Sequence, residues 1–285
     1  MTTTKVTKKQ MAEIIKKIPA GWKYKPAIPK PAVIQPIAPY NFPSVDMRPV
    51  IKNIGLEVRQ QAGGAPCAVH AFTFTLEYEY IRHVFSNLSE QYLQYVTFQV
   101  VKPQMTGGEN FWALNQGYQK WGYVPQSWLP NQATMPATVY QNILDKGKGG
   151  LRWTQIFIKI WDPTIGATKN QLDQVVKCLD QDSPVGIGVL WPIEWKTHVI
   201  NGVDLMVVPS AANKWTVVFD GHAVALVGYQ KGPAFPGGGY FIFRNSWGKD
   251  WGDRGYGFMP FDYVLKYAND LFCWSFLVDR AGRPL

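Results

Sequence analysis

The strongest constraint on the fold is a change of sequence periodicity near Pro184. Before it, apolar residues recur at spacings of three and four, as at Val69, Phe72 and Leu76, which predicts helices. After it, short apolar or alternating runs such as VGIGVLW, WTVVF, HAVALVGY, YFIFRNSW and CWSFLV stand between Gly, Pro and Asp, which predicts strands. Helices in the first half and strands in the second indicate an α+β fold with two unlike layers or lobes.

The helical part contains four expected helices. The first begins at Cys67 in CAVHAFTFTLEYEYIRHVF, and Pro66 suits its first turn, where a missing N–H costs nothing. The second follows Ser89, a residue type that caps helices. Two more are expected over residues 110–122 and 170–181.

Residues 1–45 form a separate unit by composition. They hold eight Lys and one Glu, and seven Pro lie between positions 19 and 43. Apolar spacing between positions 11 and 18 predicts a short amphipathic helix, and the prolines predict an extended chain after it. Two interpretations stay open: a disordered leader, or a plug that lies along the body of the protein. We expect the main domain to span residues 46–285.

The net charge of +9 is concentrated in this segment, which carries +7 and leaves +2 for the other 240 residues. The body has no basic stripe interleaved with aromatic residues, so we expect no nucleic-acid partner. The sequence contains no run of about 18 apolar residues, so we expect no membrane span. It also contains no cluster with metal-ligand spacing and no phosphate-binding loop. We therefore expect no metal and no cofactor, and we expect a monomer.

The chain has three cysteines, which is a poor disulfide framework and suits a reducing compartment. The N-terminus lacks the apolar stretch of a signal peptide. Together these features predict a cytoplasmic protein, or one delivered or exported without a conventional signal peptide. Cys178 in an amphipathic helix and Cys273 in an apolar strand are interpreted as buried small hydrophobes.

Cys67 has different neighbours, because it follows the Gly-rich turn QQAGGAPC at an expected helix start. A helix N-terminus places unpaired N–H groups and partial positive charge near the sulfur, which favours the reactive thiolate. Gln61, six residues earlier, can donate toward a developing oxyanion together with the N–H of Cys67. Gln60 competes for the same role.

Four histidines are candidates for the base that would activate this thiol. His83 is expected at the surface, His70 is expected to pack within the first helix, and His198 lies in a loop-like stretch. His222 opens a strand, and a histidine at a strand end is held rigidly, as a general base requires. Asn245 ends a later strand and can orient the imidazole, while Trp247 can shield that hydrogen bond from water.

The order Cys, His, Asn within QQAGGAPC, GHAVALVGY and NSWGKDWGDRGYG resembles the papain family of cysteine peptidases. The resemblance covers residues 44–285. It implies a two-lobed fold with a helical lobe mainly over 60–160, a β-barrel-like lobe mainly over 161–285, and an active-site cleft between them. It also implies that Cys67 is the nucleophile, that His222 is its base, and that Asn245 orients the base.

The same resemblance implies that Gln61 helps to form the oxyanion hole. It further implies a set of substrate-binding residues: Gly107, Gly108, Gly188, Gly221, Ala223 and Trp247, with Phe111 or Trp112 as further wall residues. The small residues Gly188 and Ala223 suggest a roomy apolar pocket. Some positions depart from the family pattern. Ala68 replaces the usual Trp, Gly221 replaces the usual Asp or Asn, and Gly64, Met105 and Val96 replace disulfide cysteines.

The resemblance implies a cysteine endopeptidase that cuts polypeptides through a thioester, with the N-terminal segment as an inhibitory prosegment. Two alternatives remain open. The same site can act as a transferase, ligase or deamidase, because a thioester can be resolved by water or by another amine. The chain can also be a catalytically silent peptide-binding module of the same fold.

Overall fold

The computed structural model describes residues 43–61, 65–81, 87–101, 110–130, 138–149, 152–160, 165–192, 195–209 and 220–278. The helices are α2 (Arg48–Asn53), α3 (Cys67–Ile81), α4 (Glu90–Val101), α5 (Phe111–Trp121), α6 (Gln141–Gly149), α7 (Lys169–Asp180) and α8 (Phe261–Tyr267), with a 3-10 turn η3 (Pro236–Gly238). The strands are β1 (Ser44–Asp46), β2 (Arg152–Lys159), β3 (Val185–Trp191), β4 (Thr197–Ile200), β5 (Val203–Met206), β6 (Asp220–Lys231), β7 (Gly239–Arg244), β8 (Tyr256–Pro260) and β9 (Ala268–Val278).

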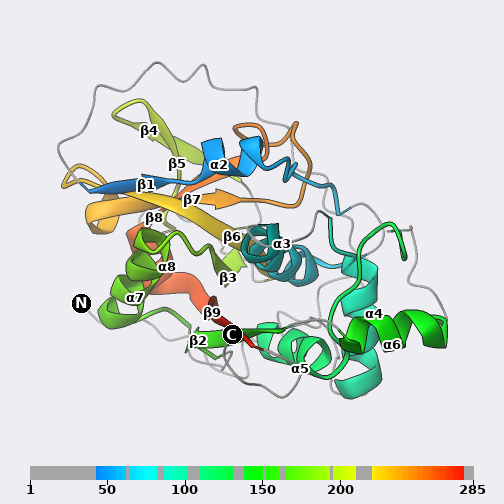
Figure 1. Ribbon diagram of the computed structural model, residues 1–285. Helices are drawn as coiled ribbons and strands as arrows, with labels where there is room; N and C mark the ends of the chain where they lie inside the picture. Colours follow the sequence, from blue (N-terminus) through cyan, green and yellow to red (C-terminus); the bar gives the residue numbers. More distant parts are fainter. Residues whose placement is uncertain are drawn as a thin grey trace.

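Within the described residues the strands form one sheet, in the order β2-β9-β3-β6-β7-β8-β5-β4, with β1 added beside β6. Every pairing is antiparallel except that of β5 with β8. Figure 1 shows α3 beside β6, with α4, α5 and α6 on one side of the molecule and α7 and α8 on the other. The fold is therefore α+β, with a large sheet and two groups of helices, as the sequence predicts.

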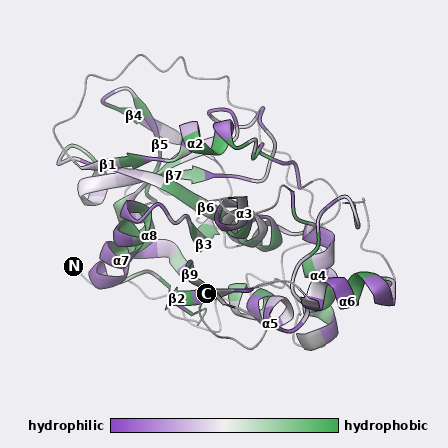
Figure 2. Ribbon diagram, in the orientation of Figure 1, coloured by the Kyte–Doolittle hydropathy of each residue, from purple (hydrophilic) through white to green (hydrophobic). Residues whose placement is uncertain are grey.

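Two hydrophobic cores hold these layers together, and α3 takes part in both. Phe74 and Tyr78 of this helix belong to the core of the sheet with α2, α7 and α8. Phe72 and Leu76 belong to the core formed with α4 and α5. In Figure 2 the hydrophobic colour is strong on β6, whereas α7 is mostly hydrophilic. Because α3 is buried from both sides, its N-terminal residue Cys67 has a fixed position relative to β6.

Several sequence predictions are confirmed. The expected helices appear as α3, α4, α5 and α7, and Ser89 caps α4 by accepting the N–H of Tyr92 at 3.1 Å. The expected strands within the described residues appear as β3, β6, β7 and β9. WTVVF and the expected N-terminal helix lie outside the described residues. The loop-like assignment of His198 is wrong, because it lies on β4, exposed, in a hairpin with β5.

The chain joins the sheet at β1, which spans the expected boundary between residues 45 and 46. Val45 of this strand pairs with Tyr229 of β6 and packs against the sheet core. Gly228 permits this close approach, since a Cβ there would lie 2.3 Å from the carbonyl oxygen of Val45. Among the described residues, no helix is both long and apolar enough to cross a membrane.

Candidate active site

His222 and Asn245 meet because two neighbouring antiparallel strands place them at the same end of the sheet. Ala225 of β6 pairs with Arg244, the last residue of β7, so the residue after β7 comes back beside the start of β6. His222 Nε2 lies 2.8 Å from Asn245 Oδ1, and both side chains are buried. The expected contact between His222 and Asn245 is present.

The hydrogen-bond pattern at Asn245 determines the tautomer of the histidine. Its Oδ1 also accepts the backbone N–H of Ser246 at 2.8 Å, which identifies this atom as the acceptor end of the amide. Nε2 of His222 must therefore donate its proton to Oδ1. In the neutral ring, Nδ1 then carries the free lone pair, which is the atom a general base needs.

Two indoles enclose the imidazole of His222. Trp247 stacks on it with ring centroids 4.6 Å apart and an interplanar angle of 29°. The edge of Trp191 approaches it at the same centroid distance, with an angle of 70°. Trp195 stacks in turn on Trp191, with centroids 5.3 Å apart. The imidazole is therefore fixed in orientation and kept from bulk water.

Burial has a direct electrostatic effect on this ring. It lowers the pKa of His222 from the ordinary 6.5 to about 4, and the hydrogen bond to Asn245 opposes part of that shift. The imidazole is neutral at neutral pH and can accept a proton.

Cys67 is the first residue of α3 and carries a half-buried thiol that is not part of a disulfide. The carbonyl of Pro66 accepts the N–H of His70 at 3.3 Å, so the helix begins directly after the Gly-rich turn. α3 packs against β6, the strand that presents His222. The helix-start position expected for Cys67 is confirmed. Gly64 and Ala62 of the turn lie outside the described residues.

A short backbone pairing joins the segment before Cys67 to the segment after Asn245. The N–H of Gln61 donates to the carbonyl of Ser246 at 2.7 Å, and Gln60 forms a β-bridge with Trp247. The Ser246 hydroxyl donates to Oε1 of Gln61, so its Nε2 end is the donor that this bond leaves unused. Gln60 instead lies against Gly248, where a Cβ would come within 2.6 Å of its Oε1.

His70, which lies three residues after Cys67 on α3, has a different environment from that of His222. His70 is 6% exposed, and its Nδ1 lies 3.4 Å from Glu90 Oε1. Arg59 pairs with both Glu90 and Glu77, the latter at 2.5 Å. Burial lowers the pKa of His70 to about 4. His70 is therefore buried by packing, as the sequence predicts, and the charged groups around it were not predicted. His83 lies outside the described residues.

Gly188, an expected substrate-binding residue, has polar side chains beside it. Gly188 pairs with Ala223 of β6 on one side and with Asp270 of β9 on the other. A Cβ on Gly188 would lie 2.5 Å from the side-chain oxygen of Asn269, so this amide occupies the space. The backbone N–H of Phe111 donates to Asp270 Oδ2 at 3.0 Å, and this brings the start of α5 to the same place. The roomy apolar pocket suggested by Gly188 and Ala223 stays a prediction.

Of the other predicted substrate-binding residues, some lie within the described residues and some do not. Gly221 is exposed and pairs with Leu190, directly before His222. Gly107 and Gly108 lie outside the described residues. In the described parts of the chain, no group of three or more His, Cys, Asp or Glu side chains is arranged to hold a metal ion.

Sequence reasoning missed three residues around this site. Trp191 ends β3 opposite the start of β6, Ser246 joins Gln61 to Asn245, and Asp270 lies beside Gly188. Strand pairing brings Trp191 and Asp270 to the site, and no local signal marks them. Ser246 lies between Asn245 and Trp247, which are both predicted site residues. Its position in the run NSWG could therefore have indicated that it belongs to the site.

Comparison with known proteins shows that this chain is similar to papain-like cysteine proteases. Residues 208–264, which include His222 and Asn245, match the model of the papain family of cysteine proteases. Xylellain, a cysteine protease from Xylella fastidiosa, has a similar structure, with a TM-score of 0.60, 20% identity, and coverage of 89% of this chain and 91% of that one. Digestive procathepsin L 3 of Tenebrio molitor larval midgut gives a TM-score of 0.58, 20% identity, and coverage of 86% and 73%. No curated protein sequence matches the chain significantly.

The fold is that of the papain-like cysteine peptidases. The family match covers β6, which carries His222, and β7, which Asn245 directly follows. Over residues 208–264 the chain is similar to the papain family of cysteine proteases, and its fold is similar to theirs.

Proposed function

We propose that this chain is an endopeptidase in which Cys67 is the nucleophile, His222 the base and Asn245 the residue that orients the base. The observation that carries the proposal is the 2.8 Å bond between His222 Nε2 and Asn245 Oδ1. With Nε2 committed to Asn245, Nδ1 remains to take the proton of a thiol. The position of Cys67 at the start of α3 places a thiol where the helix dipole favours the anion.

The reaction then follows two stages. The sulfur of Cys67 gives its proton to His222 and attacks the peptide carbonyl, and the tetrahedral intermediate collapses as His222 returns the proton to the leaving amine. Water next attacks the resulting thioester, with His222 as base, and releases the carboxylic acid. Since burial favours the neutral imidazole, the ring readily returns its proton at each stage.

Gln61 is the proposed side-chain donor to the oxyanion. Its Oε1 accepts from Ser246, which orients the amide and leaves Nε2 for the substrate oxygen. The backbone pairing of Gln61 with Ser246 holds this amide in a fixed place relative to Asn245. Gln60 is a poorer candidate, because its side chain lies against Gly248.

The N-terminal segment is proposed to act as an inhibitory prosegment. The chain enters the sheet through Pro43, whose carbonyl accepts the N–H of Lys231 at the far end of β6 from His222. About nine extended residues, at ~3.4 Å each, span the length of that strand. The 42 residues that precede Pro43 are ample to reach the catalytic end.

Labelling with an epoxysuccinyl inhibitor tests the catalytic assignment. We expect one inhibitor per chain on Cys67, measured by mass spectrometry, and no labelling after Cys67→Ala. Cys178→Ala is the matched control and should label normally. A folded protein that cuts no peptide mixture and takes no label, with or without residues 1–40, would support the binding module instead.

A further inference from the structure

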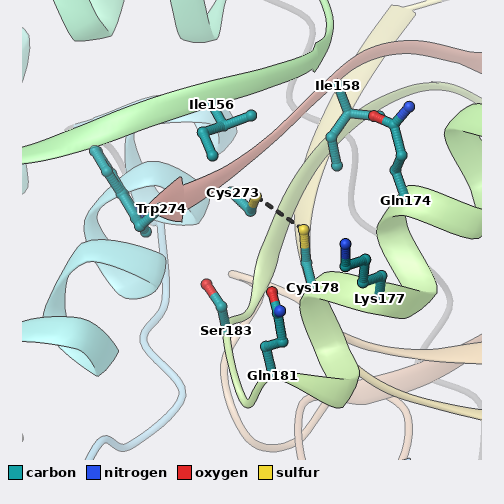
Figure 3. Close-up of a pocket in the computed structure, with 9 residues that line it drawn as sticks. All are labelled: Ile156, Ile158, Gln174, Lys177, Cys178, Gln181, Ser183, Cys273 and Trp274. Carbon is teal, nitrogen blue, oxygen red and sulfur yellow. Dashed lines mark hydrogen bonds between the residues drawn. The ribbon is translucent and has the colours of Figure 1, made fainter. Parts of the chain in front are cut away.

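Cys178 and Cys273 lie in contact, although 95 residues separate them in the sequence. Cys178 projects from α7 and Cys273 from β9, and the two sulfur atoms are 2.9 Å apart. Figure 3 shows the two side chains pointing toward one another across a hollow between α7, β2 and β9. The interpretation of these cysteines as separate buried hydrophobes is therefore incomplete.

The contact is close enough for a covalent bond to form with little movement. A disulfide has an S–S length of about 2.05 Å, so the sulfur atoms need to approach by roughly 0.9 Å. Cys178 is at the last turn of α7, and the carbonyl of the same residue already accepts the N–H of Ser183 at 3.0 Å. We expect small rotations of the two side chains to close this gap while α7 keeps its place on the sheet.

The two thiols differ in exposure and in acidity. Cys178 is half-buried and lies beside Lys177 in the hollow, whereas Cys273 is 3% exposed. The hydrogen bond between them lowers the pKa of Cys178 and raises the pKa of Cys273. An oxidant that enters the hollow therefore meets Cys178 as the more acidic and more accessible sulfur.

We propose that Cys178 and Cys273 are a reversible two-electron oxidation site, with hydrogen peroxide or an organic hydroperoxide as the oxidant. The Cys178 thiolate attacks a peroxide oxygen, and the O–O bond breaks to give a sulfenic acid and a hydroxide or alkoxide. That leaving group takes up the proton that Cys178 released on ionisation and departs as water or an alcohol. Cys273 then attacks the sulfenic sulfur, the S–S bond forms, and hydroxide leaves with the Cys273 proton as water. Two thiols and one hydroperoxide are consumed, and a thiol reductant reverses the reaction.

The bond would tie α7 to β9 through a closed loop of 95 residues. Such a loop is long, and cross-links that close long loops restrict the unfolded chain most. α7 also leads directly into β3, which pairs with β6 opposite His222. The oxidised form is thus a more stable form of the same fold, and it leaves the catalytic groups untouched.

The test uses the full chain with Cys67→Ser, because only Cys178 and Cys273 then remain. We expect hydrogen peroxide to remove both titratable thiols without forming dimers, and dithiothreitol to restore them. Trypsin should release residues 178–196 joined to residues 267–280, and the peptide pair should weigh two hydrogens less than its separate parts. The Tm should rise by roughly 5–10 °C on oxidation.

Cys273→Ser in the same background is the matched control, and it should leave Cys178 as a sulfenic or sulfinic acid with no rise in Tm. The proposal is overturned if Cys178 reaches the sulfinic acid while Cys273 stays a free thiol, or if the disulfides join different chains. Where Cys67→Ser does not fold, the same peptide pair is sought in the oxidised protein with all three cysteines.

Discussion

The indole of Trp247 lies stacked on the imidazole of His222, at a centroid distance of 4.6 Å. Because Trp191 also meets this ring, the imidazole can turn little without displacing an indole. The bond from Nε2 to Asn245 is therefore shielded and held in place by packing, which leaves Nδ1 as the nitrogen that can accept a proton.

Replacing Trp247 by Ala should expose this bond to water and loosen the ring. We expect kcat to fall about 10-fold or more while KM changes little, since the contact acts on the base. Trp247→Phe keeps an aromatic face and should retain most of the activity. Equal loss in both variants would mean that the indole has another role.

Replacing Asn245 by Ala removes the acceptor for His222 Nε2. We expect kcat and the rate of inhibitor labelling to fall ~10–100-fold, because the tautomer and orientation of the ring are no longer fixed. Asn245→Asp keeps an acceptor and adds a negative charge, which should raise the pKa of His222. Its pH–rate profile should shift to higher pH, and an unshifted profile would contradict the assigned contact.

Acid should destabilise the protein through two buried histidines. Burial lowers the pKa of both His222 and His70 to about 4, from an ordinary value of 6.5. Between these values the unfolded chain binds protons that the folded chain does not, so stability is lost as pH falls from 6.5 toward 4. Each ring contributes roughly 1–3 kcal/mol to this loss.

Urea unfolding at pH 7 and pH 4.5 measures this effect. His70→Gln should reduce the difference in unfolding free energy between the two pH values. His198→Gln, at an exposed position on β4, is the control and should leave it unchanged. The same pH dependence in the wild type and in His70→Gln would exclude a contribution from His70.

Asp270 should change the pH dependence of stability in the opposite direction, so that the protein loses stability as pH rises. Burial raises the pKa of this carboxyl from 3.8 to about 7, and its Oδ1 has no hydrogen-bond partner among the described residues. Stability is therefore present below pH 4 and lost as pH rises toward 7. Asp270→Asn should stabilise the protein by roughly 2–4 kcal/mol at pH 8 and have little effect at pH 4. Urea unfolding at both pH values checks this, and a loss of stability at pH 8 would contradict it.

Deleting residues 1–40 should raise peptidase activity if the N-terminal segment covers the catalytic end. The rate of hydrolysis of a fluorogenic peptide gives the measurement. A synthetic peptide of residues 1–40 added to the truncated protein should inhibit it. Unchanged or lower activity in the truncated protein would argue against an inhibitory role.

Local sequence patterns predicted many of the elements well. The apolar spacing after Cys67 predicted α3, and the cap residue Ser89 predicted the start of α4. Both predictions succeeded because helix periodicity and capping depend on nearby residues. The sequence did not predict the elements α2, α6, α8, β2, β5 and β8, and it assigned His198 to a loop. The strands β2 and β4 depend on pairing partners that lie elsewhere in the chain.

The sequence by itself determined the chemistry available: a thiol at a helix start, a histidine at a strand start and an asparagine after another strand. Only the tertiary structure decided which atoms meet. Antiparallel pairing brought Asn245 to His222 and Trp191 to the same ring, and it placed Asp270 beside Gly188. It also joined Cys178 to Cys273 across 95 residues. Such contacts depend on strand order and helix packing, and these are properties of the whole chain that no local segment encodes.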